Sequence, residues 1–184
     1  ISGRGSGAAH YSRQHFTTVS NIDIGGGSAN SAVFRQGNLV GSAAMNFGGR
    51  VIEIKDGIVT AITRAGAWII SEAGVQIGVG DRPTLGELTR VTDSMADVTV
   101  HLIDGTTSPL AEKLYQTPPN PVSGAGKPVM FSGGIGYYFY SPIVLNSVAD
   151  VSRHGDIGPL LAQSLRFHPK IKSYNIINPA ETQR

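Results

Sequence analysis

Residues 21–28 read Asn-Ile-Asp-Ile-Gly-Gly-Gly-Ser, an apolar strand that leads one carboxylate, that of Asp23, into a triple-glycine turn. Because glycine has no side chain, successive backbone N–H groups can point into one concavity that accepts a phosphate. A carboxylate at the end of the strand would then hold a hydrated metal ion or orient an attacking water. The alternative is a plain hairpin turn that needs positive φ, with Asp23 capping its own backbone. This stretch alone leaves both interpretations open.

A second glycine-rich segment follows a short apolar run much later in the chain, where residues 132–136 read Ser-Gly-Gly-Ile-Gly. Such a loop lets a flat base or a sugar lie against bare backbone. A glycine pair at residues 48–49 closes the third predicted strand between the two segments. These segments add a nucleotide site to the interpretations that remain open beside a plain hairpin.

The regular elements are predicted from apolar periodicity and from turn signals. Residues 17–24, 28–35 and 39–47 are predicted as three antiparallel strands, and residues 51–54 and 58–62 as a hairpin around Asp56-Gly57. We expect helices over 65–77, after the capping box of Thr84 and Glu87, from Ser108 to about 115, and after Pro159. Two further strands are predicted at residues 129–131 and 174–177.

Composition narrows the class of protein. The length of 184 residues suits one domain, or one domain with a subdomain, and the absence of cysteine excludes a disulfide scaffold and thiolate metal sites. Fifteen Lys and Arg residues, scattered along the chain against thirteen Asp and Glu, argue against a nucleic-acid partner. The 24 glycines are well above average usage. Residues 128–149 carry no charge, but their prolines and glycines predict a buried strand plus loop and argue against a membrane span.

The five histidines give a weaker signal. Their spacing is not that of a metal site, so a satisfied or solvated role is predicted for each of His10, His15, His101, His154 and His168.

Five segments carry a resemblance to a known family. In order and separation, the two glycine loops resemble the second phosphate motif and the adenosine motif of the actin, Hsp70 and sugar-kinase ATPase superfamily. Residues 21–30, 46–50, 103–110, 131–136 and 156–161 resemble, more narrowly, the large, ATPase-type subunit of the reactivating factor of ethanolamine ammonia-lyase. Residues 1–8, with glycines at 3, 5 and 7, are similar to the stretch that enters this half of the family's fold.

The resemblance implies an α/β fold of the actin-like ATPase (ribonuclease-H-like) type, with a mixed sheet and flanking helices. Residues 1–49 and 104–184 would form the nucleotide-binding subdomain, and residues 50–103 a smaller inserted subdomain. Asp23 would be catalytic and would hold a metal ion through water. The other expected contacts are to phosphate at Gly25, Gly26, Gly27 and Ser28, to adenosine at Ser132, Gly133, Gly134, Ile135 and Gly136, and in the cleft at Gly48 and Gly49.

The function implied is ATP-dependent, chaperone-like reactivation of ethanolamine ammonia-lyase by release of damaged cobalamin. The implied cofactors are ATP and Mg²⁺, the partners are the lyase and ATP or ADP, and the location is the cytoplasm, with association with a bacterial microcompartment as a further expectation. The superfamily's first phosphate loop is expected before residue 1, and the family's chain continues past residue 184. ATPase activity is therefore expected of the full-length protein and not of these 184 residues alone. Two alternatives remain open, a small-molecule phosphotransferase of the same fold and a non-catalytic interaction module.

Overall fold

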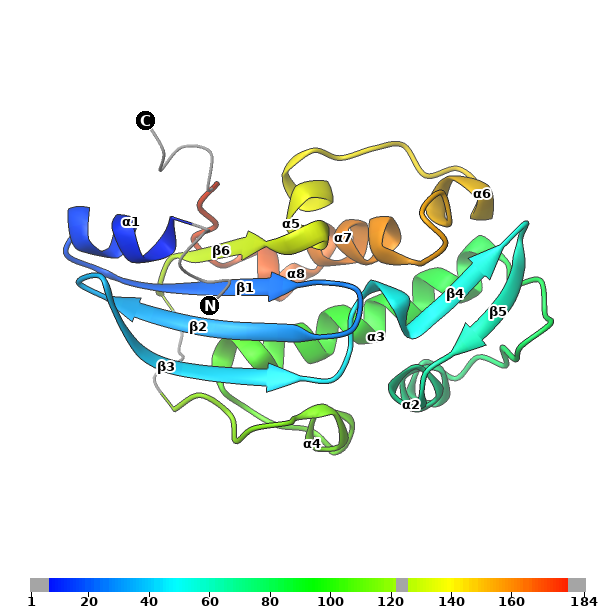
Figure 1. The fold of residues 1–184 in the computed structure, drawn as a ribbon, viewed down its shortest axis with the longest axis horizontal. Helices are drawn as coiled ribbons and strands as arrows, with labels where there is room; N and C mark the ends of the chain where they lie inside the picture. The colour runs from blue at the N-terminus through cyan, green and yellow to red at the C-terminus, as the bar shows by residue number, and fades with distance from the viewer. Residues whose placement is uncertain (1–6, 122–125, 179–184) are drawn as a thin grey trace.

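The central sheet has four strands in the order β3-β2-β1-β6 (Figure 1). The computed structural model describes residues 7–121 and 126–178, so the resemblance noted for residues 1–8 lies almost wholly outside them. As predicted, β1 (Thr18–Ile24), β2 (Ala29–Arg35) and β3 (Asn38–Met45) form an antiparallel meander, and β6 (Val129–Ser132) pairs parallel to β1. The predicted mixed sheet with flanking helices is confirmed.

The register between β1 and β6 brings the two glycine segments to one edge of the sheet. Asp23 lies opposite Ser132, and parallel strands end at the same edge. The turn after β1 and the segment after β6 are therefore neighbours, although more than a hundred residues separate Asp23 from Ser132 in sequence.

Helices cover both faces of this sheet. The main core holds Ile22, Ile24 and Met45, which pack with apolar residues of α3 (Leu85–Asp104) and α7 (Gly158–Phe167). The predicted capping box starts α3, because Thr84 accepts from the Glu87 amide while Glu87 accepts from the Thr84 amide. On the other face, α1 (Ala8–Gln14) packs with Val19, Phe34 and Met130.

A second, two-stranded sheet lies beyond the edge of the first at which β1 and β3 end (Figure 1). Its strands, β4 (Ile52–Lys55) and β5 (Ile58–Ile62), meet at the predicted turn, where Asp56 and Gly57 have φ of 52° and 75°. The 3₁₀ turn η2 (Gly49–Val51) leads into it and α2 (Arg64–Glu72) follows it. Helix α3 contacts β2 and β3 of the first sheet as well as α2, which follows the second sheet. The division at 49/50 and 103/104 stays a prediction.

The remaining helices are short. Helix α4 (Pro109–Leu114) starts at Ser108 as predicted, α6 (Val148–Val151) precedes α7, and α8 (Pro169–Lys172) follows it. Within residues 7–121 and 126–178, no helix combines the length and the apolar character needed to cross a bilayer.

Three expectations were wrong in detail. The helix predicted over 65–77 ends at Glu72, because the chain reverses through Gly74 at a φ of 63°. Residues 174–177 make a single bridge between Ile176 and Val129 and form no strand. The loop expected at and after residues 133–136 is a helix, α5 (Gly133–Tyr140).

Helix α5 was not predicted from the sequence, because glycine and tyrosine are poor helix formers. Tertiary contacts stabilise it instead. The ring of Phe139 stacks on that of Phe131 at 4.4 Å, and the Tyr140 hydroxyl accepts from the Phe131 amide at 3.0 Å and donates to the Ile177 carbonyl at 2.7 Å. Buried Ile135 and Phe139 share one face of the helix at a spacing of four residues.

Candidate functional site

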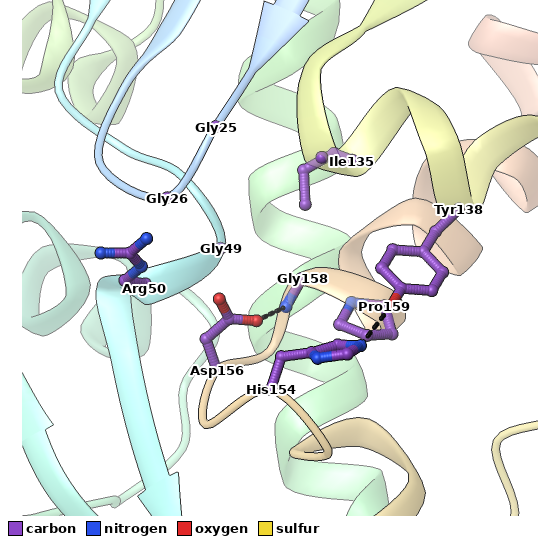
Figure 2. A pocket seen from close by; sticks show the side chains of 11 residues that line it. Gly25, Gly26, Gly49, Arg50, Ile135, Tyr138, His154, Asp156, Gly158 and Pro159 are labelled. Carbon is purple, nitrogen blue, oxygen red and sulfur yellow. Dashed lines mark hydrogen bonds between the residues drawn. The ribbon is translucent and has the colours of Figure 1, made fainter.

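A pocket of about 410 Å³ opens where the glycine segments meet (Figure 2). This size lies within the range usual for small-molecule and cofactor sites, about 300–1,000 Å³. Its walls come from the turn after β1, from η2, from α5 and from the start of α7. The lining residues are Gly25, Gly26, Gly49, Arg50, Gly134, Ile135, Tyr138, His154, Asp156, Gly158 and Pro159.

The turn after β1 is fixed by backbone hydrogen bonds. The Gly25 amide donates to the Ser28 carbonyl at 3.0 Å, which closes the turn. The carbonyls of Gly25 and Gly26 accept from the amides of Gly49 and Arg50 at 3.0 and 2.8 Å. The turn therefore rests on η2, with Gly25 and Gly26 on the pocket wall, whereas Gly27 and Ser28 lie outside the lining.

The glycine pair at 48–49 permits this close contact. A Cβ on Gly48 would meet the Gly25 carbonyl oxygen and come within 2.7 Å of the Gly26 carbonyl carbon. A Cβ on Gly49 would lie 3.1 Å from the Gly158 Cα, and the Gly49 carbonyl accepts from the Ile157 amide at 3.1 Å. Gly48 thus supports the wall from behind, and Gly49 lines it.

Part of the second glycine segment lines the pocket, and the rest connects α5 to the central sheet. Gly134 and Ile135 line the pocket. Ser132 accepts from the Asn21 side-chain amide at 3.0 Å, Gly133 turns the chain at a φ of 76°, and Gly136 packs against the Phe131 backbone. These three residues join α5 to β1 and β6, and the pocket lining does not include them.

Asp23 stands at the end of β1, beside the first residue of α5. A Cβ on Gly133 would meet the Asp23 Oδ1 atom, so the carboxylate lies against this junction, and it is not among the pocket-lining residues. Asp23 is half-buried, and its side chain makes no hydrogen bond or ion pair with any other residue that the structure describes. A carboxylate of this kind is open to water or to a hydrated cation.

Sequence reasoning assigned no site role to the charged groups of the pocket. Arg50 is exposed and its guanidinium lies beside Gly26 (Figure 2). The guanidinium makes no ion pair or hydrogen bond with any other residue that the structure describes. Asp156 lines the pocket, and its Oδ1 accepts from the Gly158 amide at 2.9 Å at the start of α7. Both residues lie in segments that carry the family resemblance. A basic residue directly after a glycine pair was the sequence signal that could have identified Arg50 as a site residue.

A metal ion here would need ligands from outside the protein. No cluster of three His, Cys, Asp or Glu side chains suited to a metal occurs in residues 7–121 and 126–178. Mg²⁺ usually binds through one or two carboxylates and completes its shell with water and substrate phosphates. A single unpaired carboxylate such as that of Asp23 fits this mode of binding.

Gly134→Val tests whether the pocket binds nucleotide. A Cβ on Gly134 meets nothing within 4 Å and its φ is not positive, so the variant is expected to fold. The branched side chain would occupy the pocket, and nucleotide affinity measured by calorimetry on the full-length protein should fall roughly tenfold or more. Gly86→Val is the matched control, because Gly86 is equally unobstructed but lies on α3 away from the pocket. Equal affinities in the two variants would place the nucleotide elsewhere.

Comparison with known proteins agrees with the resemblance seen in the sequence. The family model "Ethanolamine utilisation protein EutA" matches residues 1–184. The ethanolamine ammonia-lyase reactivase EutA of Escherichia coli K12 is 41% identical over the whole chain, and that of Salmonella typhimurium LT2 is 38% identical. The chain spans 38% of the length of each of these curated relatives. No solved structure matches it. The chain therefore belongs to the EutA family of ethanolamine utilisation proteins.

Proposed function

We propose that this chain forms one wall of an ATP site in a protein that reactivates ethanolamine ammonia-lyase by releasing damaged cobalamin. The observation that carries the proposal is the parallel pairing of β1 and β6, which brings two glycine segments far apart in sequence to one pocket. The reactivase names of the two relatives support the lyase as the partner and its reactivation as the outcome. The fold proposed is that of an actin-like ATPase.

The two ends of the pocket differ in chemistry, which suits a nucleotide. At one end the bare backbone of Gly25 and Gly26 lies beside the Arg50 guanidinium, a combination that favours phosphate through charge-assisted hydrogen bonds. At the other end Gly134 and Ile135 leave room for a sugar or a base against α5. Gly27 and Ser28 continue the same turn beyond the pocket wall, and we propose that they contact phosphates that project out of the pocket.

Asp23 is proposed as the residue that matters for hydrolysis. A bound Mg²⁺ would neutralise charge on the phosphates. The Asp23 carboxylate, which is free of other described side chains, would orient the water shell of the ion or the attacking water.

We place the protein in the cytoplasm, in association with a bacterial microcompartment.

Co-precipitation of the full-length protein with ethanolamine ammonia-lyase tests the function. We expect the lyase to be captured, with an amount that changes when ATP replaces ADP, because a remodelling protein must bind its client differently in its two nucleotide states. Serum albumin in place of the lyase is the control. Failure to capture the lyase in any nucleotide state, together with phosphate transfer to a small molecule, would favour a phosphotransferase of the same fold.

A further inference from the structure

The side of the pocket opposite Arg50 is lined by side chains that contain rings. Figure 2 shows the side chains of Tyr138, Pro159 and His154 gathered on one side, with Arg50 across the pocket from them. The three come from different elements, since Tyr138 belongs to α5, Pro159 starts α7, and His154 lies in the turn between α6 and α7. Ile135, one turn before Tyr138 on α5, adds an apolar surface beside them.

Tyr138 and His154 hold each other in place across this wall. The Tyr138 hydroxyl and the His154 Nε2 atom are hydrogen-bonded, and the two rings lie 5.9 Å apart between centroids with their planes at 38°. The backbone under each ring is also anchored. The Tyr138 carbonyl accepts from Arg166 at 3.1 Å, and the turn that carries His154 is closed by the Gly155 amide at 2.8 Å from the Ser152 carbonyl.

This arrangement has features of a preformed binding surface. His154 is exposed and Tyr138 is half-buried, so solvent reaches both rings where they face the pocket. The neighbouring turn and helix have other supports, because Val151, Ile157 and Leu161 are buried in the main core. Removal of either ring should therefore leave the fold intact. Ordering two rings in advance lowers the entropy cost when a ligand binds.

We propose that Tyr138 and His154, backed by Pro159, form the subsite that receives the base of the nucleotide. The inference rests on the proposed ATP site and adds the side chains that would contact the base of the nucleotide. The base is flat and apolar on its faces, and it stacks on aromatic rings and on imidazole. With phosphates near Gly26 and Arg50, the base is directed toward the opposite wall, where these rings lie.

The test separates base binding from phosphate binding. Calorimetry on the full-length protein would measure the affinity of ATP and of inorganic tripolyphosphate, which shares the charge but has no base. Loss of one stacked ring is expected to weaken ATP roughly tenfold in Tyr138→Leu and in His154→Gln while tripolyphosphate is unaffected. Arg50→Gln should weaken both ligands. Tyr137→Leu is the matched control, because Tyr137 precedes Tyr138 on α5 but is 68% exposed and outside the pocket lining.

Tyr138→Phe distinguishes the ring from its hydroxyl. It keeps the stacking surface and removes the hydrogen bond to His154, so most of the ATP affinity should remain. Loss as large as in Tyr138→Leu would overturn the stacking proposal, as would equal weakening of ATP and tripolyphosphate in Tyr138→Leu. Normal ATP binding by both Tyr138→Leu and His154→Gln would overturn the base subsite and leave the ATP site standing. Absence of ATP binding in the wild-type protein would instead overturn the proposed function itself.

Discussion

Gly48→Ala is expected to weaken nucleotide binding strongly and to lower the Tm of the protein. Gly48 has an extended backbone with φ of −170°, which any residue can adopt, so the cost is steric rather than conformational. The added Cβ would overlap the backbone of Gly25 and Gly26, which cannot rotate away as a side chain can. The turn after β1 and η2 must then move apart. The hydrogen bonds that the Gly49 and Arg50 amides donate to this turn are lost.

The size of the effect follows from overpacking and from the lost geometry. Forcing one carbon into a filled site costs about 1–3 kcal/mol of unfolding free energy. Nucleotide affinity should fall by roughly a hundredfold, because both the phosphate loop and Arg50 leave their positions. Thermal melting and calorimetry on the full-length protein would measure the two effects. Gly86→Ala is the control, since a Cβ at that position on α3 meets nothing within 4 Å and Gly86 lies outside the pocket lining. A Gly48→Ala protein that binds nucleotide normally would show that the packing of the turn on η2 is dispensable.

Most of the fold could be predicted because local signals agreed with one another. The meander follows from β-branched and apolar residues broken by glycine turns, and α3 from its capping box and apolar stripe. In both cases the residues that determine the element are close together in the sequence. Helix α5 could not be predicted in this way, because its stability comes from the stacking of Phe139 on Phe131 and from the contact of Tyr140 with Ile177.

The candidate site, too, could be predicted only where the signal is local in the sequence. The glycines that approach one another were visible in the sequence, since the lack of a side chain is itself the signal. Their functions were less visible, because Gly25 and Gly134 line the pocket while Gly48 and Gly133 only allow other segments to meet. The pair of Tyr138 and His154 gave no local signal. Two residues 16 apart, on either side of α6, become partners only when α5 and α7 pack together.

The largest effect on turnover is expected for Asp23→Asn in the full-length protein. Asparagine keeps the size of the side chain and removes its charge. Affinity for ATP should change by tenfold or less, about 1.4 kcal/mol, because binding energy comes mainly from the glycine segments, Arg50 and the rings. Hydrolysis should fall by roughly a hundredfold or more, since a group that orients water or a metal shell acts chiefly in the transition state. Reactivation of the lyase should fail with it.

Asp156→Asn provides the comparison, because it makes the same chemical change at a carboxylate that lines the pocket. The Asp156 Oδ1 already accepts from the Gly158 amide, and an asparagine side chain can keep that hydrogen bond. Its loss of turnover should therefore be the smaller of the two, and the reverse order would move the catalytic role to Asp156. A plain hairpin role for Asp23 predicts a third pattern, in which Asp23→Asn melts at a lower temperature but hydrolyses ATP normally per folded molecule. Melting curves recorded beside the ATPase assay distinguish the three, because only a role in the transition state lowers turnover while affinity and Tm are kept.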